Sequence, residues 1–377
     1  MRPFLAIIIV FVLIGSLGCS VGGDGMEQPA AAPGNAGAGG ADSFPAAAED
    51  QGPAPDFSGM SFISLEVQPD ENPIFVIDGR GYMQMSEDGF DRGHAADLVA
   101  GIDSILKARG IPLVYVATLP RFDTKDFSKA KKKDFFGQRH DDLIESLSRA
   151  GVDVLDAKKE LADAGERYLY PFKTDLHLET AGEFRTAMLL ADKLESIGIE
   201  IPDKDIVFDP KSYLIESYEL NGNLATWDDI AIIGNDEFEF WIPVFDTDLT
   251  LENPAIDSVR SGTFRETIMN GMEYKESHAR EYGPYWVRNY LQYPCTYYTI
   301  DNHMNEDGPR LLFLIDSIAL RTTAYFSLGA GHITIVDPRE GGIDHLNEEI
   351  FYGEYDAVII AAASRSFYQG VALVNEG

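Results

Sequence analysis

The sequence predicts an α/β fold with a mainly parallel sheet and an added β-rich segment. Apolar strands and amphipathic helices alternate from residue 74 to 155, and the alternation returns from 311 to 360. Parallel strands need crossover connections, usually helices, so this order predicts a sheet with helices on its faces. Residues 203–308 are rich in aromatic and acidic residues broken by Pro and Gly, and we expect a β-rich insertion there.

The first half of the sheet is predicted from short apolar runs and one clear helix. A strand at 74–77 opens the pattern. A helix over 95–109 carries its apolar residues on one face and stops at Gly110, a residue that favours helix ends. The run 112–119 is a buried strand, and a further helix leads to a strand at 152–155. This βαβα order indicates strands that run parallel.

The second half repeats the rhythm after the insertion. Within the insertion, residues 237–245 alternate as a half-buried strand does. A fully apolar strand follows at 311–315, and two further strands at 332–336 and 356–360 lie on either side of a helix at 343–351. These strands complete the predicted sheet.

The N-terminal residues are typical of an export signal. Within 1–19 a short apolar run ends in small residues and Cys19, a pattern that resembles the lipidation site of bacterial lipoproteins. A plain secretory signal or an uncleaved anchor stays open. Residues 20–57 are mostly Gly, Ala, Pro and acidic residues, so we expect a disordered linker before a folded domain at 58–377. We therefore expect a cell-envelope protein that faces the extracytoplasmic side and touches the membrane only through its N-terminal anchor.

Charge and cysteine content exclude some classes of function. The net charge of −32 repels phosphate backbones and anionic headgroups, which argues against nucleic-acid binding. The basic residues at 129 and 131–133 lie in a polar stretch, where a solvated loop is favoured over contact with an anionic polymer. Cys19 and Cys295 are the two cysteines, so a mature lipidated domain would hold no intramolecular disulfide.

Asp175 and His177 stand two residues apart, just before a helix predicted over 181–197. In an extended or tightly turned backbone such residues point the same way, so the carboxylate can orient the imidazole. Three interpretations stay open: a structural pair at the helix start, two ligands of a metal site, or the acid–base half of a Ser-His-Asp system. The histidines are scattered along the chain, which weakens the metal interpretation.

Ser317 is the candidate nucleophile for such a system. It follows the strand 311–315 and Asp316 directly, and a helix begins beyond it. A serine at this step emerges at the carboxyl edge of the sheet, where open α/β sheets bind ligands. The mature chain has no Gly-x-Ser-x-Gly elbow, which disfavours the α/β hydrolases. The alternative is that Ser317 only caps the helix.

These pieces resemble the alginate O-acetyltransferases and the related DHHW proteins. The stretch 173–177 with Gly182 is similar to the family signature K-T-D-x-H-W-T-x-x-G. The stretch 311–320 (LLFLIDSIAL) resembles the strand-Asp-Ser nucleophile segment, and 335–339 (IVDPR) resembles the I-D-P-R stretch of DHHW proteins. The resemblance covers about residues 73–368 and implies an SGNH-hydrolase-like three-layer sandwich in which Asp-x-His precedes the serine.

The resemblance also implies roles for the three residues. Ser317 would be the nucleophile, His177 the general base, and Asp175 the group that orients His177. The implied reaction is a ping-pong acyl transfer: the serine takes an acetyl group and passes it to a sugar hydroxyl or to water, without a cofactor. The implied partners are a polysaccharide substrate and a membrane protein that supplies acetyl groups.

The chain departs from the family pattern near the histidine. Leu176 and Leu178 stand where a DHHW protein has His and Trp, and Ile315 stands where a Gly often precedes Asp-Ser. No Asn is an evident oxyanion donor, and Ser364 and Ser366 are the nearest polar candidates. Two functions therefore stay open: a serine-dependent polysaccharide O-acetyltransferase or acetylesterase, and an inactive carbohydrate-binding or assembly protein with the same fold.

Overall fold

The architecture is taken from a computed structural model of the chain. It describes residues 59–64, 74–77, 80–83, 92–118, 135–166, 172–175, 177–220, 236–254, 257–269, 297–338, 341–362 and 371–375. The chain divides into two compact units, Met1–Gly52 and Pro53–Gly377, and every described residue belongs to the second. The export segment, Cys19, Cys295 and the basic run at 129–133 lie outside the described residues. Their predicted roles stay predictions.

One eight-stranded sheet forms the centre of the folded unit, in the order β5-β4-β13-β11-β12-β10-β8-β9. Five neighbours from β5 to β12 run parallel, and β10, β8 and β9 add antiparallel strands. The strands are β4 (Leu113–Ala117), β5 (Asp153–Asp156), β8 (Leu249–Asn253), β9 (Ser258–Gly262), β10 (Tyr297–Asn302), β11 (Arg310–Ile315), β12 (His332–Val336) and β13 (Ala357–Ala361). The predicted α/β class with a mainly parallel sheet is confirmed.

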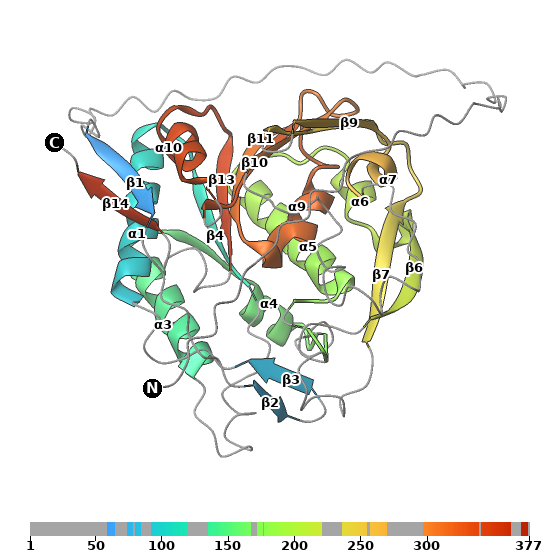
Figure 1. The fold of residues 1–377 in the computed structure, drawn as a ribbon, viewed down its shortest axis with the longest axis horizontal. Coiled ribbons are helices and arrows are strands. Elements are labelled where there is room, and N and C mark those ends of the chain that lie inside the picture. Colours follow the sequence, from blue (N-terminus) through green and yellow to red (C-terminus); the bar gives the residue numbers. More distant parts are fainter. Residues whose placement is uncertain are drawn as a thin grey trace, which may run out of the picture. The chain divides into compact units, whose positions relative to one another are not determined.

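Helices cover both faces of this sheet, as Figure 1 shows for α1, α3 and α10 on one side and α5 and α9 on the other. The helices are α1 (Arg92–Ala108), α3 (Phe135–Arg149), α4 (Ala157–Asp163), α5 (Thr180–Ser196), α6 (Lys204–Val207), α7 (Phe264–Thr267), α9 (Leu320–Phe326) and α10 (Ile343–Tyr352). Two 3-10 turns, η2 (Pro210–Ser212) and η5 (Ser317–Ala319), complete the helical elements of the described residues.

The sheet separates two apolar cores because successive side chains of a strand point to opposite faces. In β11, Leu312 and Leu314 join the core under α1 and α10. The alternate residues Leu311, Phe313 and Ile315 join the core under α5 and α9, and all five are at most 1% exposed. A strand buried on both faces reads as an unbroken apolar run, which is why the sequence identified β11 without ambiguity.

The predicted insertion has two structural roles. Its first strands, β6 (Tyr213–Leu220) and β7 (Asp236–Pro243), pair with each other as a separate antiparallel ribbon beside α5 (Figure 1). Its later strands β8, β9 and β10 extend the main sheet instead of forming a body of their own. The pairing of β10 with β8 and with β12 joins segments that are distant in the sequence, so the local sequence pattern did not reveal it.

Two further strand pairs lie outside the main sheet: β1 (Met60–Ser64) with β14 (Val371–Asn375), and β2 (Ile74–Ile77) with β3 (Arg80–Met83). The strand predicted at 74–77 therefore exists, but its predicted place in the main sheet is wrong, because it pairs with the segment directly after it. The first pair joins segments near the two ends of the folded unit. Asn347 of α10 fixes it there, because its amide group exchanges hydrogen bonds of 2.6 and 2.9 Å with the backbone of Phe62. In the parts of the chain that the structure describes, no helix has the length and apolar character needed to cross a membrane.

Candidate active site

The loop that carries Asp175 and His177 is held by the start of β7. Both carboxylate oxygens of Asp236 accept from it: the Lys173 backbone N–H at 2.8 Å, the Thr174 backbone N–H at 2.6 Å and the Thr174 hydroxyl at 2.5 Å. Asp236 and Thr174 are 6% and 0% exposed. A buried carboxylate that accepts three hydrogen bonds fixes its donors firmly, so the ribbon β6–β7 sets the path of this loop.

Asp175 and His177 form a hydrogen-bonded pair within the loop. The Asp175 Oδ1 atom lies 2.5 Å from His177 Nδ1 and also accepts from the His177 backbone N–H at 3.0 Å. Asp175 is fully buried and His177 is 5% exposed. In the tautomer that donates from Nδ1 to this carboxylate, the lone pair of Nε2 points away from the acid.

Ser317 follows β11 at the carboxyl edge of the sheet, as the sequence predicts. It begins the turn η5, and the N-cap of that turn is Asp316, whose Oδ1 accepts from the Ile318 backbone N–H at 2.9 Å. The capping role considered for Ser317 thus belongs to the preceding aspartate. The Ser317 hydroxyl instead contacts a side chain outside this turn.

The structure brings the three predicted site residues together across 140 residues of sequence. His177 Nε2 lies 3.3 Å from Ser317 Oγ, on the opposite side of the ring from Asp175. Ser317 is partly exposed, whereas its two partners are buried. An acid–imidazole–hydroxyl chain in this order can withdraw the serine proton onto Nε2 and stabilise the imidazolium through the carboxylate.

The backbone next to Ser317 offers one donor for an oxyanion. Within the described residues, the Ser317 N–H has no hydrogen-bond partner. The neighbouring Ile318 N–H is already used by Asp316. A tetrahedral oxyanion formed on Ser317 would therefore find the serine's own N–H, as acyl-transfer sites require.

Further predictions for this region concern the residues next to His177, the candidate oxyanion donors and a metal site. Leu178, which stands where the family has Trp, is 5% exposed and packs against Leu161, so its side chain faces the interior. Leu176, Ser364 and Ser366 lie outside the described residues. As for the metal interpretation, no group of three or more His, Cys, Asp or Glu side chains within the described residues could hold a metal ion.

Sequence reasoning missed three polar residues that surround the site: Asp236, Glu183 and Arg321. Glu183 and Arg321 are each 2% exposed and lie on α5 and α9, the helices that follow His177 and Ser317. A signal was present, because Arg321 is a lone charge in an otherwise uncharged helix. Charged residues are almost never fully buried unless they are paired, so such a residue predicts a partner.

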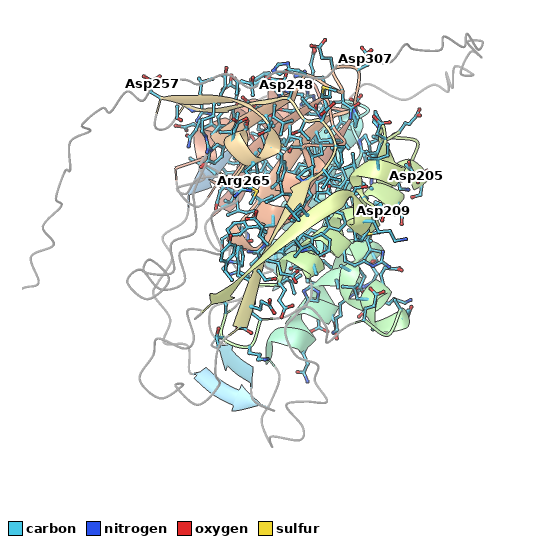
Figure 2. All side chains as sticks on the ribbon, turned by 90° about the vertical axis from the view of Figure 1, so that its right-hand side faces the viewer. Asp205, Asp209, Asp248, Asp257, Arg265 and Asp307 are labelled. Carbon is cyan, nitrogen blue, oxygen red and sulfur yellow. The ribbon has the colours of Figure 1, made fainter. Side chains whose placement is uncertain are left out.

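Figure 2 labels several charged residues on the side of the folded unit that it shows. The labelled residues there are Asp205, Asp209, Asp248, Asp257, Asp307 and a single base, Arg265. Arg265 Nη1 is itself paired with Glu216 at 3.0 Å. The net charge of −32 argues against the binding of anionic polymers.

Comparison with known families confirms the resemblance drawn from the sequence. Residues 82–212 match the family model described as SGNH hydrolase-like domain, acetyltransferase AlgX. The matched stretch includes Asp175 and His177 and ends before Ser317, so the serine rests on geometry and not on this match. No curated protein sequence matches the chain.

Solved structures share the fold at low sequence identity. A DHHW family protein from Eubacterium siraeum is 16% identical with a TM-score of 0.56, over 81% of this chain and 95% of that one. Bacillus cereus PatB1 is 14% identical with a TM-score of 0.59, over 78% and 96%. PatB1 with a sulfonyl adduct gives 15% identity and a TM-score of 0.58, over 78% and 95%. These similarities establish an SGNH-like, DHHW-type fold.

Proposed function

We propose that this chain is a serine-dependent O-acetyltransferase or acetylesterase that acts on a polysaccharide outside the cytoplasm. The observation that carries the proposal is the chain of contacts from buried Asp175 through His177 to Ser317, with 2.5 and 3.3 Å between the bonded atoms. Such an arrangement activates a hydroxyl for acyl transfer.

The reaction proceeds through an acetyl-serine. Ser317 Oγ attacks the carbonyl carbon of a donor acetyl ester while its proton moves to His177 Nε2, and the Ser317 N–H receives the oxyanion. The tetrahedral intermediate then collapses, the ester bond to the donor breaks, and the imidazolium returns the proton to the leaving alcohol. An acceptor hydroxyl repeats these steps in reverse: its proton passes to Nε2 and then to Ser317 Oγ as the acetyl group leaves.

The nature of the acyl group and of the acceptor rests on similarity. The match to a family model described as acetyltransferase AlgX favours acetyl as the group transferred. A sugar hydroxyl as acceptor gives a transferase, and water gives an esterase. The pattern that ends in Cys19 adds export and a lipid anchor, which would place the reaction at the cell envelope.

Mass spectrometry of the purified domain tests the proposal. After incubation with p-nitrophenyl acetate, we expect one acetyl adduct on Ser317 in the wild-type protein and none in Ser317→Ala. Ser196→Ala is the matched control, because Ser196 is an exposed serine at the end of α5 whose hydroxyl donates to the Lys193 carbonyl at 2.6 Å. That variant should acetylate at the wild-type rate.

The same experiment separates the two classes of function. Transfer of the adduct to added oligosaccharides indicates a transferase, and its loss to water indicates an esterase. If the wild-type protein binds glycans but never forms an acyl-enzyme, the chain is an inactive binding protein and the proposal is wrong. Ester turnover that survives in Ser317→Ala would equally overturn the assignment of the nucleophile.

A further inference from the structure

A buried guanidinium lies between the two halves of the candidate site. Arg321 is on α9, four residues beyond Ser317, and is 2% exposed. Removing a guanidinium from water is costly unless hydrogen bonds and an opposite charge replace the lost hydration. The residues that supply these hydrogen bonds and this charge therefore identify the segments that Arg321 holds together.

The first partners of Arg321 belong to the loop that carries the histidine. Its Nη2 donates to the backbone carbonyl of Leu178, the residue directly after His177. Its Cζ also lies 5.9 Å from the ring centre of Phe172, at the other end of the loop. The Phe172 N–H donates to the His177 carbonyl at 3.4 Å, so the two ends of the loop are joined to each other as well. One side chain thus contacts the loop on both sides of Asp175 and His177.

The second partner is a carboxylate on α5. Arg321 Nη2 lies 3.4 Å from Glu183 Oε1, and the other oxygen of Glu183 accepts from the Thr322 hydroxyl at 2.7 Å and from its backbone N–H at 3.3 Å. Burial raises the pKa of the Glu183 carboxyl, while Arg321 and the hydrogen bonds from Thr322 act against that rise. Glu183 therefore ties the helix after the histidine to two consecutive residues of the helix after the serine.

These contacts connect His177 and Ser317 through a short, buried path. Ser317 is joined to Arg321 by the turn η5 and the first residue of α9, and Arg321 is joined to His177 by the Leu178 carbonyl. We propose that Arg321 is a positioning residue that sets the distance between His177 Nε2 and Ser317 Oγ, with Glu183 as its counter-ion. The inference rests on the proposed function, because that distance matters only if the serine reacts.

The geometry requires arginine in particular. The guanidinium is planar and presents several N–H groups in a fixed fork, so it donates to a carbonyl and a carboxylate while its face packs on an aromatic ring. Here the ring centre of Phe238 lies 5.6 Å from Cζ, in addition to that of Phe172. A lysine keeps the charge but is a point donor without a flat face. It cannot reproduce all of these contacts at once.

The test compares Arg321→Lys with the wild-type protein in two measurements. In p-nitrophenyl acetate turnover we expect kcat to fall about 10- to 100-fold with KM within about twofold, because a misplacement of about 1 Å costs up to that much. In the crystal structure of the variant we expect the His177 Nε2–Ser317 Oγ separation to exceed about 3.5 Å, beyond hydrogen-bond reach. Arg185→Lys is the matched control, since Arg185 pairs with Glu166 at 3.1 Å nearer the surface. It should change neither quantity.

A second variant tests the same proposal in case Arg321→Lys does not fold. Glu183→Gln keeps Arg321 and the shape of the side chain but removes the counter-ion, and we expect kcat to fall about three- to tenfold at unchanged KM. The effects of Arg321→Lys and Glu183→Gln should be less than multiplicative in the double variant, because both act on one contact. The inference is wrong if a folded variant, either Arg321→Lys or Glu183→Gln, keeps the wild-type kcat and the wild-type distance between His177 Nε2 and Ser317 Oγ. If the wild-type protein itself shows no turnover, the proposed function fails, and the separation in the variants still decides the role of Arg321.

Discussion

Asp236 offers a sharp test of how the candidate site is held, because its effect on stability can be worked out from its contacts. Replacing it with alanine removes the acceptor of three hydrogen bonds, from the Lys173 N–H and from both donors of Thr174. The Thr174 donors are buried with no exposure of the residue, so water cannot replace the carboxylate there without rearrangement of the loop.

The expected cost follows from these bonds. A hydrogen bond to a charged group contributes about 1.5–3 kcal/mol, and a buried donor left unsatisfied costs about 1–3 kcal/mol. The loop can relax towards solvent and recover part of this, so we expect Asp236→Ala to lower the free energy of unfolding by about 3–5 kcal/mol. Thr174→Val removes the hydroxyl bond to Asp236 but keeps both backbone amides, and should cost about 1–2 kcal/mol.

Urea unfolding at equilibrium measures both values, provided that the m-values agree across the variants. Glu237→Ala is the control, because Glu237 is the exposed neighbour of Asp236 in β7 and should change the free energy by less than about 0.5 kcal/mol. The reasoning is refuted if Asp236→Ala costs no more than Thr174→Val, since the two backbone amides would then contribute nothing. Asp236→Ala should also lower ester turnover, because it frees the loop that carries His177.

Three further outcomes are expected. Asp175→Asn should lower kcat for ester turnover by about 10³- to 10⁴-fold without unfolding the domain, because an amide no longer holds the imidazole in the required tautomer; a loss below about tenfold would contradict this role. Cys19→Ala should abolish palmitate labelling and move the protein from the membrane fraction to the soluble fraction, and a wild-type protein that carries no lipid would refute lipidation. Burial, followed by the hydrogen bond to Glu349, raises the pKa of Tyr355. The folded state therefore keeps this proton above pH 10 while the unfolded state loses it, and stability falls as pH rises. From pH 9 to 11 the free energy of unfolding of Tyr355→Phe should fall by about 1.4 kcal/mol less than that of the wild type, whereas Tyr352→Phe, at an exposed site of α10, should follow the wild type.

The sequence predicted the elements of the sheet well where burial on both faces leaves an unbroken apolar run. The strand predicted at 311–315 is β11 (Arg310–Ile315), and the one at 332–336 is β12 (His332–Val336). The helix predicted at 95–109 is α1 (Arg92–Ala108), which Gly110 follows with φ of +75°. Only a residue without Cβ adopts that conformation readily, so Gly110 alone was enough to predict where the helix ends.

The predictions were weaker where pairing joins distant segments. Nothing in a local pattern tells that β8, β9 and β10 extend the main sheet while β6 and β7 pair apart from it. The strand β14 was not predicted, because its partner β1 lies some 300 residues away in sequence and three of its five residues are only half-buried. Such strands take their stability from the partner, which a local pattern does not contain.

The sequence by itself determined which residues could do chemistry. Asp175, His177 and Ser317 are recognisable because an acid two residues from a histidine and a serine directly after a buried strand are local patterns. Tertiary structure decided whether they act as one group: the 3.3 Å contact between His177 and Ser317 exists only because α5 and α9 pack together. It also decided the surroundings of that contact. Arg321 and Glu183 compensate each other's charge inside the protein, and only folding brings together two charges so far apart in the chain.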